Sequence, residues 1–163
     1  MLHGDTGVSF IPRKGEGTVA LYAQNNTLDI LLSEMDYLKK YPFFCMEQTS
    51  SKLLGLLAEK RVRSELGQPF DGAKEIDAFV RKLEKAQGFD GGWAWWEGGN
   101  PDLYITCYVI HALLPLRPDP LVGSAIRNGL LYLQNRLGSM KREPLLSALM
   151  AMSEAGHLMD YRP

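Results

Sequence analysis

The stretch Tyr41-Pro-Phe-Phe-Cys-Met-Glu-Gln-Thr-Ser50 marks the boundary between two predicted helices. Pro42 ends the first helix, because a proline disfavours the helical conformation of the residue before it. The second helix begins at Cys45 or Met46. Cys45 and Gln48 are then three residues apart on its first turn, so their side chains can face each other. Loss of ammonia between the Cys45 thiol and the Gln48 carboxamide would form an internal thioester, an electrophile that a nucleophile opens once.

Helical patterning extends on both sides of this stretch. Upstream, Asn26 or Thr27 can cap a helix whose apolar residues repeat with a period near 3.6 residues: Leu28, Leu31, Leu32, Met35 and Leu38. Downstream, capping residues, prolines and glycines delimit five helices, at about 45–66, 71–88, 103–114, 119–138 and 143–156. The helix over 103–114 is apolar on nearly all sides, and we expect it to be largely buried.

Residues 1–25 have a different pattern. The segments 8–11 and 17–23 show partial alternation of apolar and polar residues around a turn signal at 12–17. We predict a hairpin or two short strands here, with the helical domain covering 26–163. The predicted fold class is mainly α, with six helices whose short connections favour antiparallel hairpins.

The loop 88–102 contains three tryptophans and five glycines, a composition unlike that of a solubilising linker. A thioester must be kept from water. The candidate apolar cover consists of aromatic residues from this loop and from the segment before Cys45: Phe43, Phe44, Trp93, Trp95 and Trp96. The alternative is that the tryptophans fill the core and the glycines occupy turn positions.

Composition narrows the function classes. The net charge is −1 with no dense basic cluster, so nucleic-acid binding is disfavoured. No run of 18 apolar residues occurs, and the N-terminus lacks the pattern of a signal peptide. Two cysteines are too few for a disulfide scaffold, although one bridge between them stays open. The abrupt ends suggest a piece of a longer protein.

No other motif competes strongly with the Cys45–Gln48 pair. Metal-binding histidine pairs, phosphate-binding glycine loops and serine elbows are missing from the sequence, so we expect no metal and no cofactor. His111 is expected to be an interior histidine, and Cys107 a core residue. Cys45 itself has a plain alternative as a small buried residue that starts a helix. A helix N-terminus, however, stabilises a thiolate and makes the cysteine more nucleophilic.

The stretch 41–50 resembles the thioester motif of alpha-2-macroglobulins, in particular the bacterial ones, in which an aromatic residue and a proline precede Cys-x-Glu-Gln-Thr. The segments 87–93 and 103–109 resemble the region that follows this motif, and the likeness runs from about residue 17 to about residue 137. Vertebrate members usually have glycine at the position of Met46, whereas bacterial members vary there.

The resemblance implies an α/α toroid, the thioester domain, of which this chain would be the first half. Residues 1–25 would link it to a preceding β domain. Cys45 and Gln48 would form the bond, and the supporting residues of the motif would be Tyr41, Pro42, Met46 and Glu47. In the family, bait cleavage exposes the thioester and a lysine of the attacking protease is captured. The implied protein is thus a single-use protease trap of the bacterial periplasm or cell envelope, and not an enzyme. Its implied partners are target proteases and other domains of the parent chain.

Two alternatives belong to other classes. One is a helical-repeat binding module that has lost thioester chemistry. The other is an isoprenoid-processing enzyme of the same toroid fold, which the sequence disfavours because it contains no Asp-rich metal motif and no zinc-ligand set. We also predict that this piece by itself does not hold the thioester, and that open apolar faces of the half ring favour its self-association.

Overall fold

A computed structural model of the chain describes Gly15 and residues 45–157. Gly15 is an exposed turn residue with a φ of 91°, within the predicted turn. The predicted strands of 1–25, the predicted helix from Asn26, and the motif residues Tyr41, Pro42, Phe43 and Phe44 lie outside the described residues.

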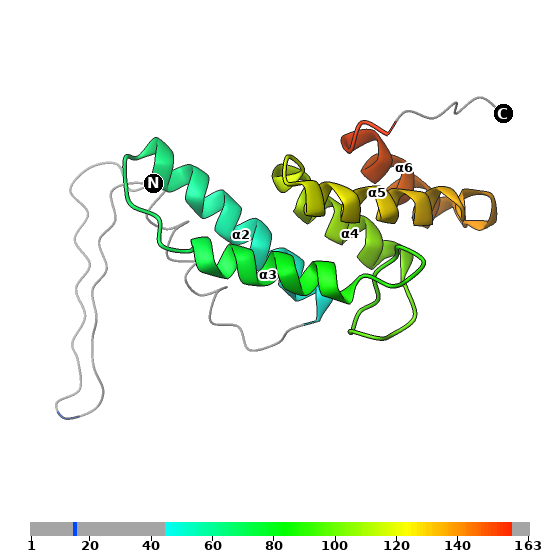
Figure 1. The fold of residues 1–163 in the computed structure, drawn as a ribbon, viewed down its shortest axis with the longest axis horizontal. Coiled ribbons are helices and arrows are strands. Elements are labelled where there is room, and N and C mark those ends of the chain that lie inside the picture. Colours follow the sequence, from blue (N-terminus) through cyan, green and yellow to red (C-terminus); the bar gives the residue numbers. More distant parts are fainter. Residues whose placement is uncertain (1–14, 16–44, 158–163) are drawn as a thin grey trace.

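Five α-helices make up most of the described part (Figure 1). They are α2 (Met46–Glu65), α3 (Ala73–Ala86), α4 (Leu103–Leu113), α5 (Pro120–Gln134) and α6 (Arg142–Glu154). Two 3₁₀ turns, η1 (Leu114–Leu116) and η2 (Leu137–Ser139), follow α4 and α5. No strand occurs between residues 45 and 157. The described part is therefore mainly α, as predicted, while the toroid and the β segment before it stay predictions.

The helix ends follow from local sequence signals. Asp119 caps α5 by accepting a hydrogen bond from the Leu121 N–H at 2.8 Å, and Pro120 occupies the first helical position. Asp102 caps α4 in the same way, by accepting from the Ile105 N–H at 3.0 Å. Gly67 follows α2 with a φ of 64°, a conformation that favours glycine. The fifth helix is shorter than predicted, because the chain leaves the α-helix at Gln134 and tightens into η2.

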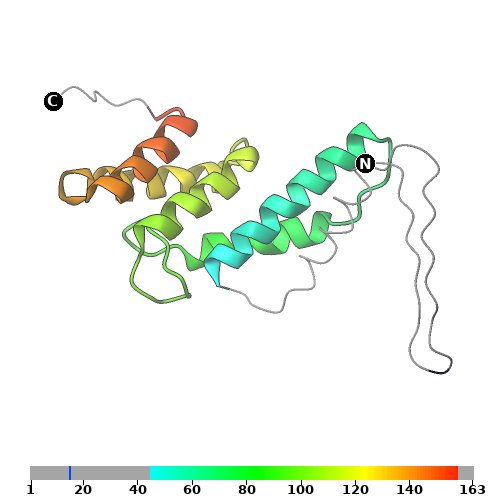
Figure 2. The same ribbon diagram turned by 180° about the vertical axis from the view of Figure 1, so that it is seen from behind.

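Helix α4 lies at the centre of the described fold and packs against α2, α5 and α6. Helices α2 and α3 run antiparallel side by side, and α5 and α6 lie on the other side of α4 (Figures 1 and 2). Most of α4 is buried, including Cys107, which is in the core as expected. His111 is different: its side chain is 52% exposed, so the expectation of an interior histidine is wrong. It faces outward because it shares the outer side of α4 with Tyr104, seven residues before it.

Trp93 is the largest fully buried side chain, with no exposed area. Its indole Nε1–H donates to the Leu83 carbonyl at 2.7 Å, so the one polar group of the ring is paired. Gly129 of α5 lets this ring approach the helix backbone, since a Cβ there would lie 2.7 Å from Trp93 Cζ3 and 3.0 Å from Ile110 Cδ1. Trp93 thus ties α3, α4 and α5 into one core.

None of the helices in the described ranges combines the length and the hydrophobicity needed to cross a bilayer.

Gly129→Ala is expected to lower the free energy of unfolding by about 1–3 kcal/mol, the usual cost of overpacking a filled core. The matched control is Gly55→Ala in α2, where a Cβ would meet no described atom within 4 Å. That change is expected to raise stability by about 0.5–1 kcal/mol, because alanine favours a helix over glycine. Urea denaturation followed by circular dichroism measures both, and equal effects at the two positions would contradict the packing described for Trp93.

Candidate functional site

Cys45 occupies the N-cap position of α2, with extended backbone angles (φ −65°, ψ 168°). Its side chain is buried, with 5% of the residue exposed, and forms no disulfide. The backbone N–H groups of a helix's first turn lack partners within the helix and carry a partial positive charge. A sulfur at this position lies where negative charge is favoured.

Gln48 folds back over the first turn toward Cys45. Its Oε1 accepts a hydrogen bond from the Cys45 backbone N–H at 3.3 Å, and the Cys45 side chain faces the Gln48 backbone N–H in the reciprocal arrangement of a capping box. The carboxamide of Gln48 and the thiol of Cys45 therefore lie on the same helix end. The structure brings together the two residues that the sequence predicted to react.

Hydrogen bonds from within α2 and from the loop 88–102 hold the rest of the first turn. Within α2, the Thr49 hydroxyl and the Thr49 N–H both donate to the Cys45 carbonyl at 2.9 Å. From outside, the Trp95 carbonyl accepts a hydrogen bond from the Met46 N–H at 2.9 Å. Met46 is 2% exposed, whereas Glu47 is half-buried in the first turn. The glycine- and tryptophan-rich loop, residues 88–102, thus touches the start of α2 through its backbone.

The three tryptophans of this loop have different surroundings. Trp93 lies in the core, as the core-filling alternative expected, whereas Trp95 and Trp96 are 43% and 61% exposed. The Trp95 ring stacks on Tyr104 with 6.1 Å between ring centroids. A covering role for these rings stays a prediction, although the loop that carries them borders the Cys45–Gln48 pair.

An aromatic row on α4 extends from this loop to the next turn of α2. Tyr104 stacks on Tyr108 at a centroid distance of 6.0 Å, and the Tyr108 and Ser51 hydroxyls lie 3.0 Å apart. Ser51 is three residues after Gln48, one turn further along the helix. No motif in the sequence marks these residues, yet the spacing of Tyr104 and Tyr108 by four residues places both on one helix face.

The loop is also anchored to α3 and α4. The Glu97 carboxylate pairs with Lys85 of α3 at 3.1 Å, and the Trp93 N–H donates to the Thr106 hydroxyl of α4 at 2.9 Å. Gln87 donates to the Gly91 carbonyl at 2.8 Å and to the Ala125 carbonyl at 2.9 Å. These contacts fix the path of the loop where it passes the start of α2.

Lys82 of α3 contributes charge near the pair. Burial lowers the pKa of the Lys82 ammonium below its usual value, interactions with Cys45 and Glu97 oppose that shift, and the Lys52 charge adds to it. Lys52, on α2, is buried with 7% of the residue exposed. The Lys82 ammonium therefore lies near charges of both signs, Lys52 on α2 and Glu97 on the loop.

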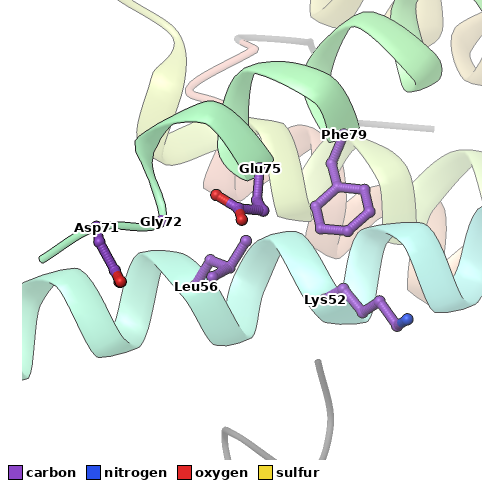
Figure 3. A pocket seen from close by; sticks show the side chains of 6 residues that line it. All are labelled: Lys52, Leu56, Asp71, Gly72, Glu75 and Phe79. Atoms are coloured by element: carbon purple, nitrogen blue, oxygen red, sulfur yellow. The ribbon is translucent and has the colours of Figure 1, made fainter. Parts of the chain in front are cut away.

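A cavity of about 260 Å³ lies between α2 and α3, at a greater distance along α2 from Cys45. Lys52 and Phe79 lie at one end and Asp71 and Gly72 at the other, with Leu56 and Glu75 between them (Figure 3). Its lining combines two apolar side chains with both signs of charge. The cavity shows the antiparallel register of the two helices, because Lys52 is opposite Phe79 and Leu56 is opposite Gly72.

Other titratable groups lie apart from this site. His111 Nδ1 and Glu154 Oε2 form a pair at 2.9 Å between α4 and α6. Among the described residues, no group of three or more His, Cys, Asp or Glu side chains is arranged to hold a metal ion.

Part of the chain is similar to a known protein. The alpha-2-macroglobulin of Thermotoga maritima is 34% identical to this chain over 74 residues, which are 45% of this chain and 5% of the Thermotoga protein. The chain therefore matches a small part of that relative's length. This partial similarity supports a distant relationship to alpha-2-macroglobulin. No protein-family model matches the chain, and no solved structure matches it.

The second cysteine gives a pH-dependent prediction. Burial raises the pKa of the Cys107 thiol from 9.0 to about 11; the Asp102 charge adds to this shift and a backbone hydrogen bond opposes it. Since the folded-state pKa is the higher one, the protonated thiol favours the folded state below pH 9, and this contribution is lost as the pH rises through 11.

Cys107→Ala is therefore expected to weaken the fall in stability between pH 9 and 11 relative to the unchanged protein. Urea titrations across that range measure the difference, and Tyr132, whose pKa burial also raises, is common to both proteins. Labelling of native Cys107 by iodoacetamide at pH 9 as fast as in the unfolded chain would contradict a buried thiol.

Proposed function

We propose that Cys45 and Gln48 form an internal thioester and that the protein is an alpha-2-macroglobulin-like protease trap. The observation that carries the proposal is the hydrogen bond from the Cys45 N–H to Gln48 Oε1 at 3.3 Å, which holds the carboxamide against the helix end that bears a buried thiol. The partial similarity to the Thermotoga alpha-2-macroglobulin supports the same class of protein.

Bond formation needs only these two side chains. The Cys45 sulfur adds to Cδ of Gln48, the C–N bond of the carboxamide breaks, and ammonia leaves with the proton of the thiol. The backbone N–H groups of the first turn of α2 favour negative charge on the sulfur as it attacks. Burial of Cys45 lowers the concentration of water at the new bond, and thereby slows its hydrolysis.

In capture the Cys45 sulfur becomes the leaving group. An amine of the target attacks Cδ of Gln48, the C–S bond breaks with its electron pair staying on the Cys45 sulfur, and the sulfur takes up the proton that the amine loses. The product is an amide between Gln48 and the target, with a free thiol at Cys45. Each molecule reacts once, so the proposed protein is an inhibitor and not a turnover enzyme.

The partners under this proposal are proteases that attack a region outside this chain, and other parts of the parent protein that rearrange on cleavage. The proposed location is the periplasm or cell envelope of a bacterium, where a trap meets foreign proteases. Each of these points depends on the resemblance of the motif and on the partial similarity reported above.

Intact mass spectrometry of the native full-length protein tests the thioester. We expect the protein to be one ammonia lighter than its sequence, and methylamine to add to Gln48 while releasing one alkylatable thiol at Cys45. Cys107→Ala is the matched control: it removes the other buried cysteine and should leave both the mass loss and the amine uptake unchanged.

A native protein in which Cys45 is freely alkylated and methylamine is not incorporated would disprove the thioester. Independently of that outcome, Cys45→Ala separates the trap from a binding module: a trap loses covalent capture of the protease, whereas a module retains all of its binding.

A further inference from the structure

Ser51 connects the first turn of α2 to α4 through two hydrogen bonds. Its Oγ lies 3.0 Å from the Glu47 carbonyl oxygen and 3.0 Å from the Tyr108 hydroxyl. A serine hydroxyl has one proton, and a carbonyl oxygen can only accept. Ser51 therefore donates to Glu47, and Tyr108 donates to Ser51. Both hydrogen bonds thus run in one direction, from α4 toward the first turn of α2.

The Glu47 carbonyl and the Gln48 N–H belong to the same planar peptide group. The capping box at the start of α2 puts the Cys45 side chain opposite that N–H. A neutral thiol is a weak acceptor, whereas an ionised acceptor forms a much stronger hydrogen bond. A negative charge on the Cys45 sulfur would therefore lie at the end of a chain of donors that begins at Tyr108.

Hydrogen bonds in such a chain strengthen one another. A donor to the carbonyl of a peptide group polarises that group, so its N–H becomes a stronger donor. Cys45 is buried, and Ser51 and Tyr108 are half-buried, so water competes with these bonds less than it would at an exposed site. The bond from Ser51 also restrains the plane of the 47–48 peptide group, which keeps the Gln48 N–H directed at the Cys45 side chain.

We propose that Tyr108 and Ser51 are positioning residues that act through the 47–48 peptide group to stabilise negative charge on the Cys45 sulfur, and that they thereby speed the opening of the thioester. The second part rests on the proposed function. When an amine attacks Cδ of Gln48, the C–S bond breaks, its electron pair stays on the sulfur, and the sulfur takes up the proton that the amine loses. The Gln48 N–H stabilises the charge during this step. Tyr108 and Ser51 form no covalent bond and give up no proton.

Four variants of the full-length protein remove these hydroxyls singly or together. Tyr108→Phe removes the first donor and keeps the ring, Ser51→Ala removes the donor to Glu47, and a double variant removes both. Tyr104→Phe is the matched control, because Tyr104 lies one turn earlier on α4 and stacks on Tyr108 through its ring, whereas its hydroxyl is not part of the chain. Circular dichroism establishes that each variant is folded, and either single variant suffices for the test.

The first readout is the rate at which methylamine opens the thioester. We expect Ser51→Ala to lower this rate about threefold, near the lower end of what one hydrogen bond contributes. Tyr108→Phe should lower it about twofold, because Ser51 still donates to Glu47 but is less polarised. The double variant should match Ser51→Ala, since Tyr108 acts only through Ser51. Tyr104→Phe should leave the rate unchanged.

The second readout separates stabilisation of charge from packing. After methylamine has opened the protein, the rate at which iodoacetamide alkylates Cys45 is measured against pH. We expect the midpoint of this profile to rise by about 0.5 pH units in Ser51→Ala and about 0.3 in Tyr108→Phe, the equivalents of threefold and twofold effects. A change in packing alone would alter the plateau rate and not the midpoint. The charged side chains of the first turn and of the neighbouring elements are the same in every variant: Glu47, Lys52, Lys82 and Glu97.

The outcomes distinguish this inference from the proposed function. A native protein without the mass loss of one ammonia disproves the thioester, and the alkylation midpoint of its free Cys45 still decides whether the two hydroxyls act on the sulfur. A protein with the mass loss in which Ser51→Ala and Tyr108→Phe change neither the opening rate nor the midpoint overturns the inference alone. Additive effects in the double variant, or a changed plateau with an unchanged midpoint, also overturn it, because the hydroxyls would then act separately or only through packing.

Discussion

The need to pair the backbone N–H groups at the start of α2 organises the site. A helix leaves these first groups without internal partners. Here the Cys45 N–H is paired by the Gln48 side chain and the Met46 N–H by the Trp95 carbonyl. The first bond brings the carboxamide to the cysteine, and the second brings the loop 88–102 to both. In the same loop, the Trp93 ring lies in the core and the Glu97 carboxylate pairs with Lys85 of α3. A requirement of the backbone thereby places the side chains of Cys45 and Gln48 on one helix end.

Local signals in the sequence predicted the helices between residues 45 and 157 well. Asp119 with Pro120, and Gly67 after α2, act within a few residues of where they occur, so their effect is visible without tertiary structure. The Cys45–Gln48 pair was predictable for the same reason, since its geometry depends on a single helical turn. The end of α5 was less certain, because nothing near Gln134 forbids another α-helical turn and the tightening into η2 depends on the local chain path.

Features that depend on distant parts of the chain were missed. His111 was expected inside the protein because its helix is apolar, but only the packing of α4 against three other helices decides which face is outward. Lys82 had no motif around it, and the packing of α3 against α2 decides which charged groups surround it. The tryptophans were predicted as a group, whereas the backbone path buries Trp93 and leaves Trp96 largely exposed. Composition identified the loop without distinguishing its residues.

The hydrogen bond between the loop and the first turn of α2 joins two main-chain groups, the Met46 N–H and the Trp95 carbonyl. Such a hydrogen bond does not depend directly on which side chains the two residues carry. Side chains at these two positions can change during evolution while the hydrogen bond between loop and helix is kept, as long as the backbone conformation is the same. A search for this arrangement in other proteins should therefore compare backbone traces, because the residue types at these two positions say little about whether the hydrogen bond is present.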